Sequence, residues 1–536
     1  MLTKSDKALL RETIFRHLDG IATATSAYAL HKKGVLDYLI TNQSSTISNL
    51  TKAFKANEGY LNVALRALCS QGWLEQNLNN TDNSISYTIN SNSKVAFDLM
   101  PLYKDAVKLL NYTDRFAKEK SIGADAFIVL ERIFKKFETT YGLDISNEDS
   151  IEYQIIKHIE GVIAGPIIVL LGVNGLFHKY FMEASFTAEE YHKDPESFKK
   201  VLDFLTHLGW FTKKKNTYQF TDNGLFYAKR ASAYGVTVSY IPTFLQLDNL
   251  LFGNPLVLKE DNPEATEKHV HREMNVWGSG GAHATYFKVI DEVIIDLFNR
   301  PIEEQPKGIL DMGCGNGAFI EHIFDVIDKQ TLRGKILDEH PLLLVGADFN
   351  KAALKVTRAN LIKADIWAKV IWGDIGRPDL LAKDLKDDYN IELIDLLNVR
   401  TFLDHNRIWE APKLKSNTIS KSSGAYTYKG ERLSNNDVEA SLLEHLQKWK
   451  PFVEKFGLLI IELHTINPKL VATNIGKTAA TAYDATHGYS DQYILEVDVF
   501  KTVAEKAGLK PVDAHFARFP NTDLATVSIN LLRGTN

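Results

Sequence analysis

A glycine-rich turn between an apolar strand and a helix is the feature that most constrains the fold of this chain. The segment 307–324 reads KGILDMGCGNGAFIEHIF, and its strand ends at Asp311. Gly313, Gly315 and Gly317 follow at alternate positions, where they let the backbone come close to a ligand, and the helix after them begins with unpaired N–H groups. The pattern predicts the first strand and helix of an α/β fold with a parallel sheet and a ligand site at the carboxyl edge of that sheet.

Two more strands with acidic ends follow in order. PLLLVGADFN, from position 341, ends at Asp348 and Phe349, and KVIWGDI, from position 369, ends at Asp374 and Ile375. An ionised carboxylate can accept hydrogen bonds from both hydroxyls of a vicinal diol. These strands therefore predict acidic contacts to a ligand at the same edge.

A fourth and a fifth strand bring further polar residues to this edge. IELIDLLNVRTFLDHNRIW, from position 391, contains Asn398, Arg400, Asp404 and His405, and FGLLIIELHTI, from position 456, ends at Glu462 and His464. Ligands of open α/β sheets lie at the carboxyl ends of the strands. We expect Arg400, Asp404 and His405 to be catalytic, with His405 able to act as a base because an imidazole titrates near neutral pH.

The hydrophobic strand followed by Asp-x-Gly-x-Gly-x-Gly, with acids after the next two strands, resembles class I S-adenosylmethionine-dependent methyltransferases. The resemblance implies a Rossmann-like sheet of seven strands with a terminal antiparallel pair, and S-adenosylmethionine as the cofactor. It implies that the glycines pack against the methionine and ribose of the cofactor, that Asp348 holds the ribose hydroxyls and that Asp374 contacts the adenine. The implied cofactor-binding residues are Asp311, Gly313, Gly315, Gly317, Asp348, Phe349, Asp374, Ile375 and Asn398.

The region before this sheet is mostly helical and repeats itself. Three helices and a two-stranded wing are predicted over residues 34–90 and again over 175–220, and the third helices end in Gly-Trp, at Trp73 and at Trp210. We therefore predict two winged-helix-like units before the methyltransferase domain. The predicted domains are 1–150 with the first unit, 151–260 with the second, and 261–536 with an active-site insertion at 465–492. A chain of 536 residues is long enough for several domains.

Charge and cysteine content limit the partners and the compartment. The net charge is −5 and the basic residues are scattered, which argues against nucleic acid and against an anionic membrane surface as partners. The apolar run 161–177 is shorter than the ~20 residues of a membrane span and predicts a buried helix. With only two cysteines, a disulfide framework is excluded, and a cytoplasmic location is expected. A homodimer through a winged-helix unit is a further expectation.

The insertion places more polar groups near the predicted edge. YDATHGYSDQY, from position 483, contains Asp484, His487, Asp491 and Gln492, and we expect it to lie close to His464. Imidazoles with an oxygen donor can hold a divalent iron, manganese or magnesium ion that polarises a carbonyl group. The other interpretation is that these groups form hydrogen bonds within a loop.

The segments MNVWGSGGAH, FLDHNR and THGYSDQ, together with the winged-helix front end, resemble the metal-dependent C-methyltransferases of polyketide synthases, as in apratoxin and gephyronic acid assembly. The resemblance implies His464, His487 and Gln492 as metal ligands, with Asp484 as the next choice. It also implies methylation of an acidic carbon next to a carbonyl group in a malonyl-type substrate. No carrier domain is recognisable in the sequence, so the substrate is either a small molecule or an acyl group on a separate acyl carrier protein.

Two other functions stay open from the sequence. Winged-helix O-methyltransferases act on small molecules without a metal and use a histidine after the fourth strand as base, a position that matches His405. A winged-helix regulator that binds DNA and senses the cofactor is the alternative of another class. The acidic net charge argues against the regulator.

Overall fold

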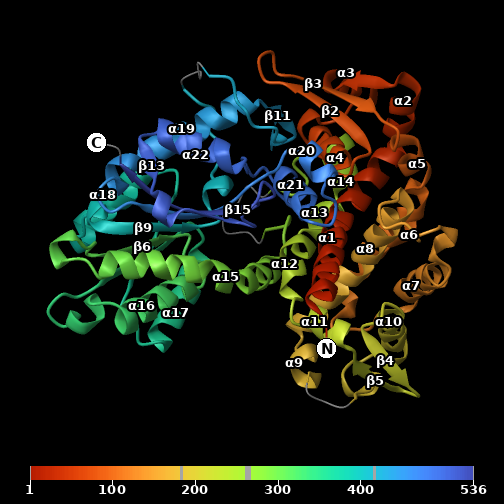
Figure 1. Cartoon of the computed structure of the whole chain (residues 1–536), viewed down its shortest axis with the longest axis horizontal. Coiled ribbons are helices and arrows are strands. Elements are labelled where there is room, and N and C mark those ends of the chain that lie inside the picture. Colours follow the sequence, from red (N-terminus) through yellow and green to blue (C-terminus); the bar gives the residue numbers. More distant parts are fainter. Residues whose placement is uncertain (1, 182–184, 260–266, 414–417, 535–536) are drawn as a thin grey trace. The chain divides into compact units, whose positions relative to one another are not determined.

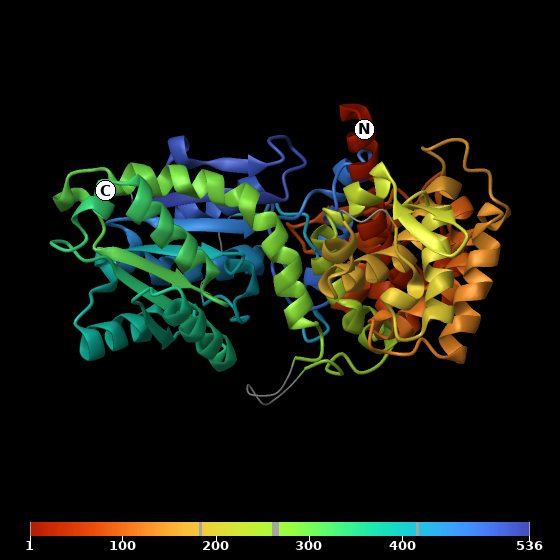
Figure 2. The ribbon, with the colours of Figure 1, turned by 90° about the horizontal axis from the view of Figure 1, so that it is seen from below.

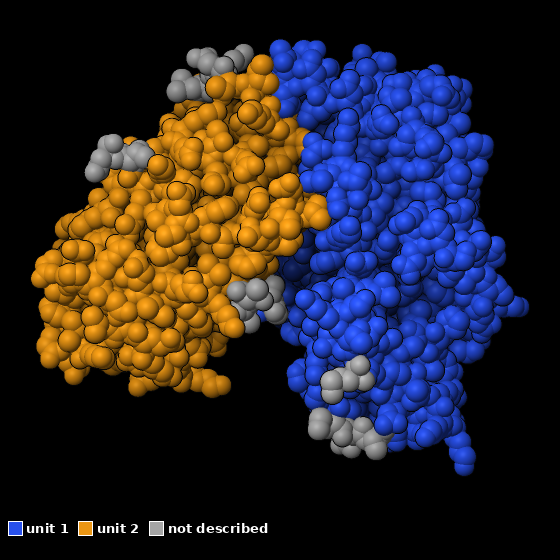
Figure 3. Space-filling model, in the orientation of Figure 1, with its two compact units in different colours: residues 1–283, 425–432, 467–491 blue, residues 284–424, 433–466, 492–536 orange. Residues whose placement is uncertain are grey.

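The computed structural model describes residues 2–181, 185–259, 267–413 and 418–534, so the predicted domain boundary at 260/261 lies outside the described residues. The chain divides into two compact units (Figure 3). Unit 1 contains residues 1–283, 425–432 and 467–491, and unit 2 contains residues 284–424, 433–466 and 492–536.

Unit 2 is built on the predicted α/β sheet. Its strand order is β13-β15-β12-β9-β6-β7-β8, and the short β14 pairs with β15. The strands are β6 (Gly308–Met312), β7 (Leu343–Asp348), β8 (Lys369–Trp372), β9 (Leu396–Thr401), β12 (Leu458–Leu463), β13 (Leu509–Pro511), β14 (Ala517–Phe519) and β15 (Val527–Gly534). Strands β12, β9, β6, β7 and β8 are parallel, and β15 is antiparallel to β12. The predicted seven-stranded sheet is confirmed, with β14 as an addition at its antiparallel side.

Helices cover both faces of this sheet (Figure 1, Figure 2). They are α16 (Ala318–Gln330), α17 (Lys351–Lys363), α18 (Pro378–Tyr389), α19 (Asn435–Val453) and α22 (Val497–Lys506), with single 3₁₀ turns at η5 (Ile302–Glu304), η6 (Arg333–Ile336), η7 (Leu393–Asp395), η8 (Asp404–Asn406) and η9 (Asp513–His515). Helices α16 and α17 pack together, as do α18, α19 and α22. Because both faces are covered, every residue of β6 and of β12 is buried, as expected for the central strands of a parallel sheet.

Two long helices form the centre of unit 1. Helices α1 (Lys4–Lys33) and α8 (Ile151–Val173) lie side by side (Figure 1). A Cβ at Gly20 would lie 2.4 Å from Cα of His158, and one at Gly161 would lie 2.4 Å from Cα of His17, so the close approach requires glycine. Helix α8 is long and apolar enough to cross a membrane, but 89% of its apolar window is buried inside the protein. The prediction of a buried helix is confirmed.

Both winged-helix-like units form in unit 1 as predicted. The first has α2 (Val35–Asn42), β1 (Ser44–Thr46), α3 (Ile47–Phe54), α4 (Glu58–Ser70), β2 (Leu74–Asn79) and β3 (Ser84–Ile89). The second has α9 (Leu176–Tyr180), η4 (Ala188–Glu190), α10 (Pro195–His207), β4 (Phe211–Lys214) and β5 (Thr217–Phe220). Gly72 and Gly209, with φ of 75° and 77°, reverse the chain between the third helix and the wing of each unit.

Short helices make up the rest of unit 1. Between the winged-helix-like units lie α5 (Ser93–Asp98), η1 (Met100–Leu102), α6 (Tyr103–Leu109), η2 (Leu110–Phe116), α7 (Ala124–Phe137) and η3 (Thr140–Gly142). After the second unit follow α11 (Asp222–Ala228), α12 (Ser232–Ser239), α13 (Ile241–Phe244) and α14 (Leu247–Phe252). Helix α15 (Arg272–Phe298), which contains the segment MNVWGSGGAH, spans the division between the units at 283/284.

Two segments from the C-terminal half of the chain belong to unit 1. They are the hairpin β10 (Tyr426–Tyr428) and β11 (Glu431–Leu433), and the insertion with α20 (Pro468–Ala472) and α21 (Ala480–Gly488). The domain prediction placed the insertion with the sheet domain, whereas residues 467–491 cluster with unit 1 in the structure. The physical reason is a set of buried contacts to unit 1, among them the ion pair of Asp484 with Arg66 of α4 at 2.9 Å.

Asp491 at the end of the insertion joins four parts of unit 1. Its Oδ1 accepts hydrogen bonds from the hydroxyls of Tyr60 and Thr427 at 3.0 and 2.8 Å. Its Oδ2 accepts one from the main-chain N–H of Lys429 at 3.0 Å and pairs with the ammonium of Lys259 at 2.7 Å. A single buried carboxylate therefore connects α4, the hairpin, the insertion and the segment after α14.

We expect Asp491→Asn to lower the free energy of unfolding by about 2 kcal/mol, because an amide keeps the shape but cannot accept all four hydrogen bonds. Asparagine tolerates the positive φ of 60° at this position, so backbone strain is not changed. Urea unfolding measures the effect. The control is Asp523→Asn at an exposed site, where no change is expected; equal stabilities of the two variants would contradict the role of Asp491.

Candidate active site

The ends of three parallel strands meet at one edge of the sheet in unit 2. Met312 of β6 pairs with Ala347 of β7 and with Arg400 of β9. The main-chain N–H groups of Gly313 and Cys314 both donate to the carbonyl of Ala347, at 2.7 and 3.1 Å. The glycine turn therefore lies directly beside the end of β7, as predicted.

The glycine turn is left-handed and its middle is open. Gly313 and Gly317 have φ of 85° and 83°, which side chains rarely adopt. A Cβ at Gly313 would come within 3.0 Å of the side chain of Leu403, so the turn packs against the loop after β9. A Cβ at Gly315 would meet only the carbonyl oxygen of Gly313, at 3.9 Å. The turn can therefore accept a ligand at Gly315 while it is supported from the side of the β9 loop.

Asp348 is held at the end of β7 by main-chain groups. Its carboxylate accepts hydrogen bonds from the N–H of Gly315 at 3.0 Å and from the N–H of Asn350 at 2.8 Å. Next to it, the half-exposed rings of Phe349 and Trp372 lie 5.6 Å apart, and the indole N–H of Trp372 donates to the carbonyl of Phe349 at 3.0 Å. A carboxylate beside exposed aromatic rings suits a ribose with an attached base, which is the fit expected for S-adenosylmethionine.

Of the remaining predicted cofactor residues, Asp374 and Ile375 follow β8, whereas Asp311 and Asn398 lie inside strands. The carboxylate of Asp374 accepts a hydrogen bond from the N–H of Gly376 at 2.8 Å. The carbonyl of the buried Ile375 accepts one from the indole of Trp449 at 2.7 Å. Asp311 is buried in β6. The structure does not bring Asn398 to the edge, because it pairs with Leu458, the first residue of β12, and its amide donates to the carbonyl of Leu396 at 3.2 Å.

His405 is oriented by a carboxylate from the neighbouring strand. Glu462 of β12 accepts a close hydrogen bond from Nδ1 of His405 with one oxygen, and the main-chain N–H of His405 donates to the other at 3.1 Å. Both side chains are buried. With the proton on Nδ1 directed at Glu462, the basic lone pair of the imidazole is on Nε2. The carbonyl of His405 also accepts from the N–H of Tyr493, at 2.8 Å.

Arg400 and Asp404 hold the loop that carries His405. The guanidinium of Arg400 contacts Asp404 at 2.5 Å, and Nε2 of His445 from α19 lies 3.0 Å from the same oxygen. Arg400 also lies over the ring of Trp449, at 4.0 Å from its centroid. Burial alone would raise the pKa of Asp404, but Arg400 and His445 hold it below its usual value. Arg400 and Asp404 are thus buried and paired with each other, and their predicted catalytic roles stay a prediction.

The predicted metal ligands come from both units. His464 and Gln492 belong to unit 2, whereas His487 and Asp484 belong to unit 1. Nδ1 of His464 contacts the carbonyl of Leu495 at 2.8 Å and its Nε2 contacts the hydroxyl of Ser528 at 2.7 Å, so both nitrogens have partners. Among the described residues, no three His, Cys, Asp or Glu side chains are grouped to hold a metal ion. Metal binding by His464, His487 and Gln492 therefore stays a prediction.

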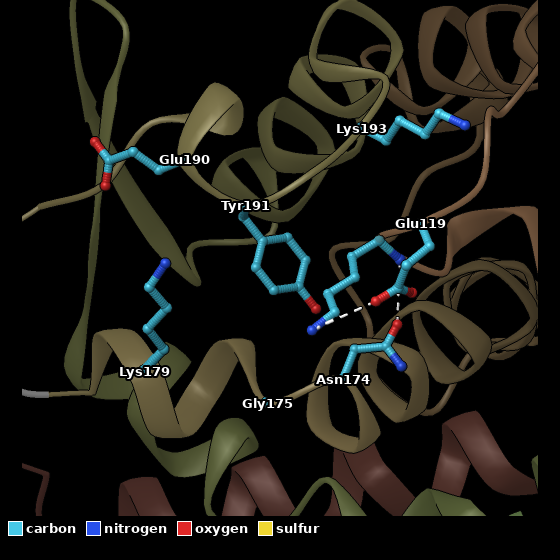
Figure 4. A pocket seen from close by; sticks show the side chains of 8 residues that line it. Glu119, Asn174, Gly175, Lys179, Glu190, Tyr191 and Lys193 are labelled. Carbon is cyan, nitrogen blue, oxygen red and sulfur yellow. Dashed lines mark hydrogen bonds and ion pairs between the residues drawn. The ribbon is translucent and has the colours of Figure 1, made fainter.

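A separate hollow of about 550 Å³ lies in unit 1 (Figure 4). It is lined by Lys118, Glu119, Asn174, Gly175, Lys179, Glu190, Tyr191 and Lys193. Lys118 pairs with Glu119 at 3.5 Å, and burial raises the pKa of the Tyr191 hydroxyl. The lining mixes both charges and contains none of the predicted site residues.

Three family models match consecutive parts of the chain. They describe an AprA N-terminal domain at residues 10–76, an AprA winged helix domain at 160–254 and an AprA MT2-like domain at 267–530. The chain is a class I S-adenosylmethionine-dependent methyltransferase of the AprA type. The winged-helix model covers the second predicted winged-helix-like unit of this methyltransferase, and the MT2-like model covers the sheet with all of the strand-end residues described above.

Several solved structures of low sequence identity align with the chain. An O-methyltransferase family protein from Burkholderia thailandensis is 11% identical with a TM-score of 0.40, and the match covers 72% of this chain and 98% of that one. An O-methyltransferase family 2 protein from Planctomyces limnophilus, in complex with apigenin, is 11% identical with a TM-score of 0.38 and coverage of 97% and 95%. The CurJ carbon methyltransferase is 12% identical with a TM-score of 0.32 and coverage of 76% and 99%. No curated protein matches the chain.

Sequence reasoning missed the roles of Glu462, His445 and Trp372. Glu462 is the last residue but one of its strand. Because the fourth and fifth strands are neighbours in this fold, their order in the sequence could have predicted that Glu462 lies near His405. His445 lies in the middle of α19, where its sequence context looks like that of any amphipathic helix. Trp372 was visible only as part of an apolar strand.

We expect Asp348→Asn to weaken S-adenosylmethionine binding by about tenfold to a hundredfold, which corresponds to about 1.4 to 2.7 kcal/mol. The amide cannot accept from two hydroxyls while it also receives the N–H groups of Gly315 and Asn350. Isothermal titration calorimetry measures the change. Asp384→Asn, on the exposed surface of α18, is the matched control; if the two variants bind equally well, Asp348 has no part in the site.

Asp311 gives the cofactor-free protein a pH-dependent stability. Burial, followed by the charge of Asp348, raises the pKa of Asp311 to about 7 from 3.8. Between these two pKa values the folded state holds a proton that the unfolded chain has released, so this stabilisation falls progressively as the pH rises from about 4 to about 7. In Asp311→Asn we expect a smaller fall of the melting temperature between about pH 4 and pH 7 than in the parent. Parallel curves would show that Asp311 does not titrate in this range.

Proposed function

We propose that this enzyme transfers a methyl group to an acidic carbon next to a carbonyl group in a malonyl or polyketide-type acyl substrate. The observation that carries the proposal is the pair of His405 and Glu462 at the edge of the sheet that also holds the glycine turn. The match to an AprA MT2-like domain over residues 267–530 supports it.

The chain's own residues would bind the cofactor and remove a proton. Gly315, Asp348 and the rings of Phe349 and Trp372 would hold S-adenosylmethionine, which when bound supplies an electrophilic methyl group. His405 accepts the proton of the acidic carbon at Nε2, and Glu462 stabilises the imidazolium that forms. Arg400, Asp404 and His445 keep the His405 loop in place, and a rigid base near the bound substrate supplies much of the acceleration through orientation.

The methyl acceptor is proposed to be either a small molecule or an acyl group on an acyl carrier protein. The protein is proposed to act in the cytoplasm and to form a homodimer. No step of this mechanism uses a divalent iron, manganese or magnesium ion. Metal assistance remains a prediction that elemental analysis of protein purified without chelator can test.

Methylation of an oxygen is the second candidate, because a histidine oriented by a carboxylate also suits deprotonation of a phenol. A DNA-binding regulator has less support. In the second winged-helix-like unit, Lys199 pairs with Glu189 and Lys213 with Asp203, so much of the local positive charge is neutralised.

We expect His405→Gln to lower kcat by about 10²-fold to 10⁴-fold, the usual contribution of a general base, with unchanged cofactor affinity. The assay follows the methylated product of malonyl-pantetheine by mass spectrometry, and nuclear magnetic resonance tells C–CH₃ from O–CH₃. His340→Gln, an exposed histidine in the same unit, is the control. Full activity of His405→Gln would contradict the proposed base, and an O–CH₃ product would favour the second candidate.

A further inference from the structure

The exposed face of α17 carries only positive charge. Lys351, Lys355, Arg358 and Lys363 are all exposed, and the helix contains no acidic residue. Lys369 follows at the start of β8, and Asp365 is the one acid between the helix and that strand. A local excess of positive charge in a chain with a net charge of −5 favours a negatively charged partner at this face.

Large apolar side chains protrude from the same region. The side chain of Trp367, four residues after the helix, is 89% exposed, that of Ile362 is 77% exposed and that of Val356 is 49% exposed. The apolar stripe of α17 that faces the sheet is a different one and contains Leu354 and Leu361, both buried. The exposed side chains therefore do not serve the core, and a partner that covered them would remove a large apolar area from water.

The arrangement of these residues fits a protein better than a membrane. A helix that lies on a membrane separates an apolar face from a basic face. Here the apolar face is already used by the sheet, and Val356 and Ile362 alternate with Lys355, Arg358 and Lys363 on the outer face. Exposed Trp and Ile between cations match the apolar centre and charged rim of a protein interface, in which Trp and Arg often dominate the binding energy.

The segment with Trp367 is tied to the helix. The guanidinium of Arg358 donates to the carbonyl of Val370 at 2.7 Å, and the N–H of Ile366 donates to the carbonyl of Leu361 at 2.9 Å. The chain between these two contacts carries Trp367. The surface therefore exists before a partner binds, which lowers the entropic cost of docking.

We propose that the exposed face of α17 together with Trp367 is a docking surface for an acidic protein domain. This domain is the acyl carrier protein that presents the substrate as a thioester, an identification that rests on the proposed function. Helix α17 begins three residues after Asp348 at the cofactor edge and, with 13 residues, extends about 20 Å from it. A carrier docked along this helix leaves the edge open for a substrate on an extended arm.

Two double variants test the surface, namely Lys355→Glu with Lys363→Glu, and Ile362→Ser with Trp367→Ser. The matched control is Leu380→Ser with Lys383→Glu, an exposed apolar and basic pair on α18. We expect KM for malonyl-loaded acyl carrier protein to rise at least about tenfold in both test variants at low salt. The kinetics with malonyl-pantetheine and those of the control should equal the parent. Addition of about 0.5 M NaCl should raise the KM of the parent with the carrier.

Unchanged KM values for the carrier-bound substrate in both test variants would overturn the docking surface. In that case, methylation of the substrate by the parent enzyme would still uphold the proposed function. If the parent methylates neither substrate, the proposed function fails, and the surface is judged by fluorescence anisotropy with labelled acyl carrier protein. Equal Kd values for parent and test variants, or no binding to the parent at low salt, would overturn it. Binding to phosphatidylglycerol vesicles but not to the carrier protein, lost in the same variants, would replace the protein partner by a membrane.

Discussion

The hydrogen-bond register of β6 with β7 and β9 is the constraint on which the site depends. It sets Met312 opposite both Ala347 and Arg400, so that the glycine turn, Asp348 and the loop of His405 begin at the same level. Gly313 then packs against Leu403, which joins the glycine turn to the loop of His405. A slip of this register would separate the glycine turn and Asp348 from His405.

Buried charges do two different tasks in the two units. In unit 2, the network of Arg400, Asp404 and His445 holds the His405 loop from the side of α19. In unit 1, Asp484 and Asp491 fasten the insertion to α4 and to the hairpin. Because an unpaired buried charge is costly, each network is stable only when every partner is in place. Residues that looked like metal ligands in the sequence therefore include parts of a structural anchor.

Local patterns were sufficient for much of the fold and of the cofactor site. The apolar strands, the Gly-Trp helix ends and the acid after each strand are set by residues close in sequence. The sheet, the two winged-helix-like units and the position of Asp348 at the end of its strand were predicted correctly from them. Asn398 lies inside β9, two residues before Arg400, and a strand pattern does not say at which residue the strand reaches the edge. His405 and Glu462 are 57 residues apart, so their pairing depends on β9 and β12 being neighbours in the sheet.

The sequence alone determined the class of the fold, the order of the domains and the type of cofactor. The glycine turn and the strand-end acids that indicate them are formed by residues close in sequence and do not depend on distant contacts. Only the tertiary structure decided that Arg400 and Asp404 pair with each other beside the His405 loop and that residues 467–491 cluster with the helical unit. Arg66 and Asp484 are 418 residues apart, and nothing in the local sequence of either residue indicates the other. Such buried pairs depend on which elements the complete core brings together.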